Sequence, residues 1–304
     1  MQSFFNLIRW KNLIMIAAMQ MLIKYALFEP FDVAITLNGF GFSLLILTTL
    51  CLAAAGNIIN DIYDVETDLV NKPKKVIVGI SISEKVAYNL FFGFNIIGVG
   101  IGFYLSLAVG KSPFFAIFVV ISVLLYIYAS YLKQMPFIGN IVISILVALS
   151  LIIVGIFDLI PAISETNKEA QFTFFKIVLD YAFFAFIINL VREMVKDLED
   201  IEGDYKAKMN TLPIAIGRAR ARQLSFVISF IPIGAVVYYI VTFLYKQQLA
   251  VAYFLVFILA PLIYISLKLY YAETKINYKH ISTILKLTMF FGMLSLLMYP
   301  IILK

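Results

Sequence analysis

Long apolar runs alternate with short polar segments along the whole chain. A helix needs about 20 mostly apolar residues to cross a bilayer. Nine such runs lie near residues 12–28, 40–58, 86–108, 113–132, 137–157, 172–192, 223–245, 248–270 and 283–302. The pattern predicts an all-α, polytopic membrane protein, in which residues 1–304 form a single domain of nine transmembrane helices arranged as a bundle.

The composition agrees with this pattern. Hydrophobic residues make up 62% of the chain and charged residues only 14%, whereas soluble domains carry roughly 25% charged residues. A soluble protein is therefore excluded. The single cysteine, Cys51, cannot form an intramolecular disulfide and is expected to pack as a small apolar residue.

Basic residues are distributed unequally between the connecting segments. Most of the 24 Lys and Arg residues lie before the first apolar run or after the even-numbered runs. By the positive-inside rule, the N-terminus is expected in the cytoplasm and the C-terminus outside. This asymmetry and attraction to anionic membrane lipid account for the net charge of +6. The charge is thus no sign of nucleic-acid binding, and no obligatory protein partner is indicated.

The second apolar run ends in a series of carboxylates, within 57-NIINDIYDVETDLVNKPKK-75. Asn57, Asp61, Asp64 and Asp68 are spaced by 4, 3 and 4 residues. At 3.6 residues per turn, this spacing places all four side chains on one helix face.

A second acidic series follows the sixth apolar run. Glu193, Asp197, Asp200 and Asp204 repeat the spacing of 4, 3 and 4 residues. Both series lie at ends predicted to be cytoplasmic. The duplication predicts two internal repeats, with acidic motifs at 57–68 and 193–204 that face each other across a cavity.

The two acidic motifs indicate a metal-dependent site. Carboxylates brought close together repel one another unless cations lie among them. Oxygen ligands without His or Cys favour Mg²⁺, which shares its coordination positions with phosphate oxygens. A diphosphate held by Mg²⁺ between the motifs is therefore expected, with lysines on its outer oxygens and a hydrocarbon tail in the apolar bundle. The alternative for either motif alone is a solvated helix end, and topology alone also predicts the lysines.

Several stretches resemble the UbiA superfamily of intramembrane prenyltransferases. Residues 60-NDIYDVETD-68 resemble its NDxxDxxxD motif, 200-DIEGD-204 with the preceding Asp197 resembles its second motif, and 125-LYIYASYLKQMPFIGN-140 resembles its segment between helices four and five. The resemblance implies a central cavity that opens to the membrane and is capped by cytoplasmic loops. It also implies transfer of an allylic group from its diphosphate to an acceptor.

The resemblance assigns roles to individual residues of this chain. The expected Mg²⁺ ligands are Asn60, Asp64, Asp68, Asp197, Asp200 and Asp204. The expected diphosphate-binding residues are Lys72, Lys74 and Lys206. Asp61 of the first motif, Lys133 and Arg192 are the expected catalytic residues, Arg192 because it is a surplus cation directly before the second motif.

The acceptor is predicted less directly. The stretch 192-REMVKDLEDIEGDYKAKMNTLP-213 is most similar to the geranylgeranylglycerol-phosphate geranylgeranyltransferase branch. This branch implies geranylgeranyl diphosphate as donor and a lipid-soluble alcohol, geranylgeranylglycerol phosphate, as acceptor. The chain departs from a common family pattern at 75-KVIVG-79. An aromatic prenyltransferase of quinone or chlorophyll-type lipid synthesis therefore remains the alternative.

A secondary transporter is the alternative from another class of protein. Transporters also combine internal repeats with intramembrane acids, but those acids lie near the bilayer midplane. Here the acids lie at helix ends. We therefore expect an enzyme in the cytoplasmic membrane, with its active site facing the cytoplasm.

Overall fold

The structure is a computed structural model that describes residues 1–303. Within these residues, nine helices are long and apolar enough to span a membrane. They are Trp10–Phe31, Gly39–Tyr63, Glu84–Ala108, Ser112–Ser130, Ile138–Ala162, Lys168–Lys206, Arg218–Leu244, Gln248–Tyr270 and Lys275–Ile301. Each contains most of one predicted run, so the predicted all-α fold with nine spans is confirmed.

Some spans are single α-helices and others combine several helical segments. The α-helices are α1 (Gln2–Leu7), α2 (Trp10–Leu22), α3 (Gly39–Tyr63), α4 (Val65–Asn71), α5 (Glu84–Ala108), α6 (Phe115–Ser130), α7 (Ile138–Asp158), α8 (Lys168–Lys206), α9 (Leu212–Ile216), α10 (Arg218–Ile228), α11 (Phe230–Tyr239), α12 (Gln248–Phe254), α13 (Ala260–Tyr270), α14 (Lys275–Leu294) and α15 (Tyr299–Leu303). Short 3₁₀ and π segments continue several of them, such as the π segments Ile240–Leu244 and Leu255–Leu259.

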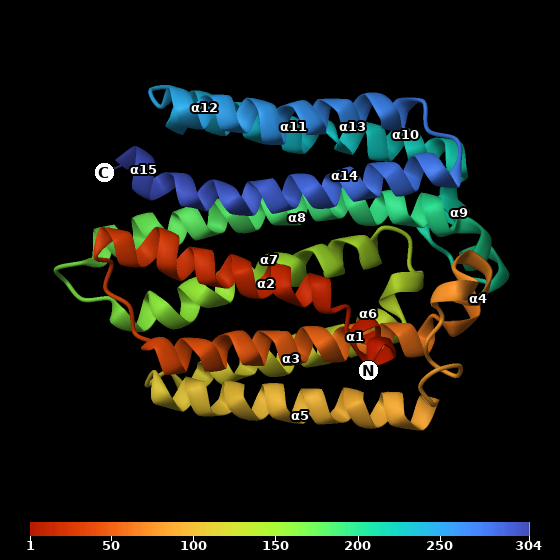
Figure 1. The fold of residues 1–304 in the computed structure, drawn as a ribbon, viewed down its shortest axis with the longest axis horizontal. Helices are drawn as coiled ribbons and strands as arrows, with labels where there is room; N and C mark the ends of the chain where they lie inside the picture. The colour runs from red at the N-terminus through yellow and green to blue at the C-terminus, as the bar shows by residue number, and fades with distance from the viewer. Residues whose placement is uncertain (304) are drawn as a thin grey trace.

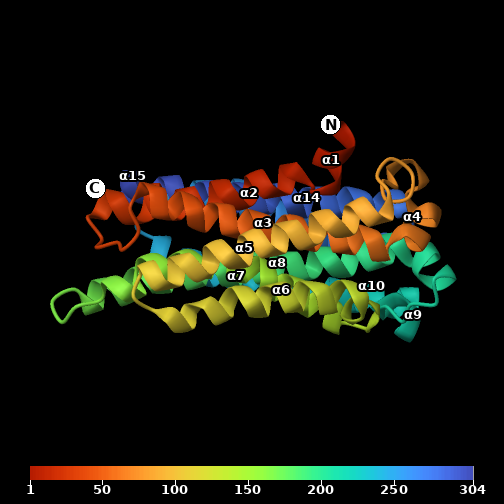
Figure 2. The same cartoon turned by 90° about the horizontal axis from the view of Figure 1, so that it is seen from below.

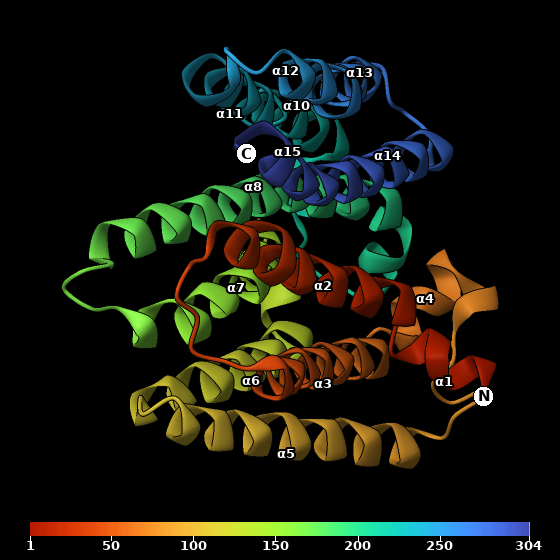
Figure 3. The same ribbon diagram turned by 60° about the vertical axis from the view of Figure 1, so that its left-hand side comes forward.

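The long helices run side by side along one axis (Figure 1). The short helices α4 and α9 lie together at one end of the bundle and the C-terminus lies at the other, as Figure 2 also shows. Across the bundle, α5 forms one edge and α11 to α13 form the other, with α2, α7 and α8 between them (Figure 3). The segments after the second and sixth spans therefore meet at one end of the molecule.

Close packing brings the central helices together. Helix α3 packs on α5, and α8 packs on both α7 and α14. Small residues permit two of the near approaches: Gly102 lies against the ring of Phe118, and Gly155 lies against that of Phe175. Cys51 is buried and unpaired, as predicted for a small apolar residue.

At the end of the bundle opposite α4 and α9, a buried lysine and a buried aspartate are paired. Lys24 and Asp158 are fully buried there, with Nζ and Oδ2 3.4 Å apart. The backbone N–H of Leu37 donates to the other Asp158 oxygen at 2.9 Å. Because unpaired charges are costly within a bilayer, this pair fixes the first connecting loop to α7.

The predicted internal repeat remains a prediction.

Candidate active site

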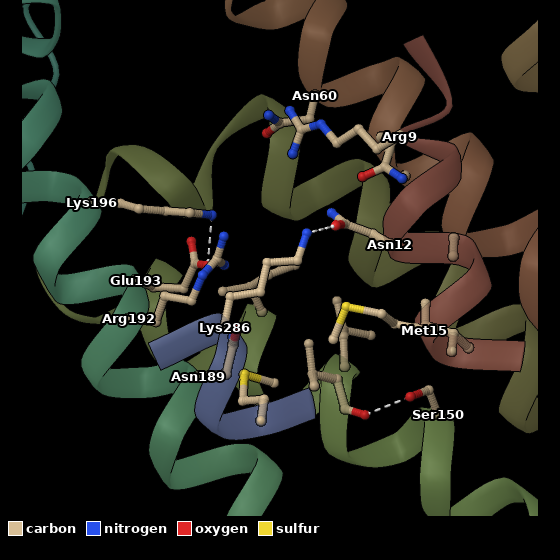
Figure 4. Close-up of a pocket in the computed structure, with 18 of the residues that line it drawn as sticks. Arg9, Asn12, Met15, Asn60, Ser150, Asn189, Arg192, Glu193, Lys196 and Lys286 are labelled. Atoms are coloured by element: carbon tan, nitrogen blue, oxygen red, sulfur yellow. Dashed lines mark hydrogen bonds and ion pairs between the residues drawn. The ribbon is translucent and has the colours of Figure 1, made fainter. Parts of the chain in front are cut away.

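A large cavity lies between the central helices. Its volume is about 1170 Å³, which exceeds the roughly 300–1,000 Å³ typical of small-molecule pockets. Acidic and basic side chains line it near α4, and apolar side chains such as Ile121, Leu146 and Phe254 line it elsewhere. The cavity can therefore accept a molecule with a charged head and a long apolar tail. Figure 4 shows a part of it that carries several cationic side chains.

The first acidic motif crosses a break between two helices. Helix α3 ends at Tyr63 and α4 begins at Val65, with Asp64 between them at φ −93° and ψ 3°. The Thr67 hydroxyl donates to the Asp64 backbone oxygen at 2.8 Å. The prediction of one uninterrupted helix is therefore wrong here, yet Asp61, Asp64 and Asp68 all line the cavity.

Cations from distant segments hold two of the three carboxylates of the first motif. Arg9 lies 2.7 Å from Asp61, and Lys133, from the loop before α7, lies 2.5 Å from Asp64. Asp68 has no such ion pair among residues 1–303. Burial and the nearby Asp64 carboxylate raise the pKa of Asp68 to about 6. A bound cation would relieve both effects.

The second acidic motif lies on one uninterrupted helix, α8. Neutral side chains hold two of its carboxylates: the Asn140 amide donates to Asp197 at 2.9 Å, and the Thr211 hydroxyl donates to Asp204 at 3.2 Å. Glu193 is placed differently, because Arg192 and Lys196 both bind its Oε1 atom, at 2.9 and 2.8 Å.

Direct contacts join the two motifs. Lys72, which follows the first motif, lies 2.5 Å from Asp200 of the second. The Asn71 amide donates to the Asp200 backbone oxygen at 2.8 Å and accepts from the Gly203 N–H at 3.1 Å. Gly203 makes this approach possible, since a Cβ there would lie 2.6 Å from the Thr67 backbone oxygen. The structure thus brings both motifs to one cavity.

The oxygen atoms of this site fit Mg²⁺. Asn60 Oδ1 and Asp200 Oδ1, one from each motif, are buried without a hydrogen-bond partner, and a buried oxygen of this kind is costly unless something binds it. Among residues 1–303 no three acidic, His or Cys side chains gather at one metal position. The tight carboxylate cluster expected from the sequence is therefore absent from that part of the chain. Mg²⁺ is commonly held by only one or two carboxylates plus water and substrate phosphates.

All but one of the predicted site residues line the cavity. They are Asn60, Asp61, Asp64, Asp68, Lys72, Lys74, Lys133, Arg192, Asp197, Asp200 and Asp204. Lys206 does not line it and is exposed at the end of α8. His280 is also exposed.

Among the polar residues of the cavity that sequence reasoning missed are Arg9, Asn140, Lys196 and Lys286. Lys196 has a signal in the sequence, because it lies within the second motif, three residues after Glu193. Asn140 lies in a stretch that resembles the family. Arg9 and Lys286 have no local signal, because tertiary packing alone brings them to the cavity.

Comparisons with known proteins identify the family of the chain. The UbiA prenyltransferase family matches residues 14–292. Digeranylgeranylglyceryl phosphate synthase from Methanosphaera stadtmanae is 32% identical over 226 residues, covering 73% of this chain and 74% of that protein. The enzyme of the same name from Korarchaeum cryptofilum is 30% identical over 250 residues, covering 81% of each.

Solved structures share the fold. A structure of a digeranylgeranylglyceryl phosphate synthase aligns with a TM-score of 0.64 at 23% identity, covering 99% of this chain and 98% of that one. A UbiA homologue from Archaeoglobus fulgidus, bound to GPP and Mg²⁺, aligns with a TM-score of 0.54 at 16% identity, covering 97% and 99%. The family match, supported by the relatives, excludes the transporter alternative. The chain belongs to the UbiA prenyltransferase family and is an integral membrane prenyltransferase.

Proposed function

We propose that the protein transfers a geranylgeranyl group from geranylgeranyl diphosphate to geranylgeranylglycerol phosphate, with Mg²⁺ as cofactor. The observation that carries this proposal is the cavity, in which two acidic motifs and several cations meet apolar walls. Such a cavity suits two substrates that each combine a phosphate head with a hydrocarbon tail. The relatives named digeranylgeranylglyceryl phosphate synthase support the choice of acceptor.

The acidic end of the cavity binds the diphosphate of the donor in this proposal. Asn60, Asp64 and Asp68 of the first motif and Asp197, Asp200 and Asp204 of the second would share two Mg²⁺ ions on that diphosphate. When bound, Mg²⁺ neutralises the negative charge that builds on the departing diphosphate.

Lys72 and Lys133 have a double role. Without a donor they neutralise Asp200 and Asp64. When metal and donor bind, both ammonium groups turn to the diphosphate oxygens, with Lys74 at the edge of the cavity. The lysines therefore keep the carboxylates charged and ordered before the substrate arrives.

The chain's side chains then assist the transfer. The bond between C1 of the allylic chain and the diphosphate oxygen breaks, and the oxygen leaves with the electron pair. Lys133 stabilises that charge, and the ring of Tyr128, which lines the cavity, faces the allylic cation. The acceptor hydroxyl oxygen bonds to C1 and its proton passes to Asp61, whose negative charge Arg9 maintains.

The product identifies the acceptor. Purified protein and Mg²⁺ are incubated with geranylgeranyl diphosphate and, in parallel, geranylgeranylglycerol phosphate, 4-hydroxybenzoate or dihydroxynaphthoate. Mass spectrometry should find a diether lipid from the first acceptor only. A prenylated aromatic product without the diether would contradict the proposed acceptor.

We also propose that the acidic end faces the cytoplasm, as the distribution of basic residues indicates. Cysteines placed at positions 72 and 206, in a background lacking Cys51, should react with an impermeant reagent only from the cytoplasmic side. Labelling from outside would contradict this orientation.

A further inference from the structure

A second charged region of the cavity is cationic. Arg192 and Lys196 of α8 and Lys286 of α14 line the cavity, and Figure 4 shows the three side chains around one space, with Asn12 and Glu193 beside them. We call these three residues the cationic subsite. These side chains cannot bind a metal cation, because they are positively charged themselves.

The charges of this subsite are only partly balanced within the chain. Two of the three cations, Arg192 and Lys196, share one carboxylate, because both bind the Oε1 atom of Glu193. Lys286 donates to the neutral Asn12 oxygen at 2.6 Å, and within residues 1–303 it forms no ion pair.

An anion is needed to complete the arrangement. Three cations and one carboxylate leave two positive charges in a partly buried space, and buried charges without a partner are unfavourable. In addition, Arg192 Nε is buried without a hydrogen-bond partner. An ion with two negative charges and several acceptor oxygens would meet both requirements.

We propose that the cationic subsite binds the phosphate monoester of the lipid acceptor. A phosphate monoester carries about −1.5 to −2 charges at pH 7 and offers three strong acceptor oxygens, whereas an aromatic carboxylate carries only one charge. This inference rests on the proposed function and assigns that acceptor its own binding residues. The acidic motifs hold the donor head, and the cationic subsite holds the acceptor head.

The test compares acceptors with and without the phosphate. Wild type and the variants Lys286→Met and Lys196→Met are assayed with geranylgeranylglycerol phosphate and with geranylgeranylglycerol. Loss of one charged hydrogen bond should raise the KM for the phosphorylated acceptor about tenfold or more. The donor KM should stay within about twofold, and the preference for the phosphorylated acceptor should shrink by the same factor as the KM rises.

Two controls exclude an effect on folding. Lys286→Arg keeps the charge and should retain most of the acceptor affinity. Lys279→Met removes an exposed lysine from the same helix and should leave both KM values unchanged. Size-exclusion chromatography in detergent should give a single monodisperse peak for each variant.

The outcomes separate the two proposals. If the wild type makes no diether lipid, the proposed function is contradicted, and so is the proposed subsite, which depends on that function. A wild type that makes the lipid, while Lys286→Met and Lys196→Met keep its acceptor KM, contradicts the subsite alone. A rise in the donor KM with no change in the acceptor KM would instead assign these cations to the diphosphate.

Discussion

The two acidic motifs share their spacing but are built differently. The first crosses a helix break at Asp64, and cations from distant segments hold two of its carboxylates. The second lies on the uninterrupted helix α8, where the neutral groups of Asn140 and Thr211 hold Asp197 and Asp204. Identical sequence spacing thus gives one motif in which cations hold Asp61 and Asp64, and one in which neutral donors order Asp197 and Asp204 while cations hold Glu193 and Asp200.

This difference suggests a division of work. A lysine or arginine can leave its carboxylate for an incoming phosphate, so the first motif can change partners when the donor binds. The neutral donors of the second motif leave the negative charges of Asp197 and Asp204 intact and fix the orientation of these carboxylates. Lys72 joins the two, since it follows the first motif and binds Asp200 of the second.

The largest effect is expected from removing one carboxylate of each motif. Asp64→Asn and Asp200→Asn should each lower kcat/KM roughly 10³-fold or more, because several kcal/mol of charge stabilisation depend on the metal. Glu66→Gln and Glu202→Gln are matched controls, because both acids are exposed and lie outside the cavity lining. Activity should also vanish in EDTA and return with excess Mg²⁺. Normal activity of Asp200→Asn would show that only the first motif holds metal.

The next effect separates two lysines that follow the motifs. Lys72→Met should raise the donor KM roughly 10- to 100-fold, because it removes a charged hydrogen bond to the diphosphate. Lys206→Met should change it less than about twofold, since Lys206 is exposed and does not line the cavity. Initial rates at varied donor concentration decide this. Equal effects of the two variants would mean that Lys206 also reaches the donor.

The contact between the motifs is tested at Gly203. A methyl group there would meet Asn71 and the Thr67 backbone oxygen, and overpacking of this kind costs about 1–3 kcal/mol. Gly203→Ala should lower the unfolding temperature in detergent and reduce kcat about tenfold, because the two motifs are forced apart.

The control is Gly234→Ala, in α11, where nothing lies within 4 Å of an added Cβ. It should leave activity unchanged and leave stability equal or slightly higher, since alanine favours helix. If Gly203→Ala behaves like this control, the close contact between Asn71 and Gly203 does not position the site.

Sequence patterns predicted the helices well and the contacts between them poorly. Spans such as Glu84–Ala108 follow directly from apolar length. The break at Asp64 has no proline or glycine beside it, and it coincides with contacts that local propensity does not describe, such as that of Asn71 with Asp200. Spacing identified the acids because a helix has a fixed period.

Contacts between polar groups of distant segments could not be predicted from the sequence. Arg9 binds Asp61, and Lys286 donates to Asn12, which lies 274 positions away in the sequence. Such pairs depend on how distant helices pack, and no local pattern encodes that packing. Lys206 shows the converse, because a lysine at the expected sequence position is exposed and does not line the cavity.

The smallest effects are expected from the neutral donors of the second motif. Asn140→Ala and Thr211→Val each remove one hydrogen bond to a carboxylate, at 2.9 and 3.2 Å. A hydrogen bond to a charged group contributes about 1.5–3 kcal/mol. Only part of this should affect metal binding, so each variant should raise the Mg²⁺ concentration for half-maximal activity roughly fivefold. Asn140→Ala should have the larger effect because its bond is shorter. Asn95→Ala, whose amide donates to the Phe91 backbone oxygen outside the cavity, is the control. An unchanged Mg²⁺ requirement in both variants would show that α8 alone orients Asp197 and Asp204. Neutral donors would then not distinguish the function of the second motif from that of the first.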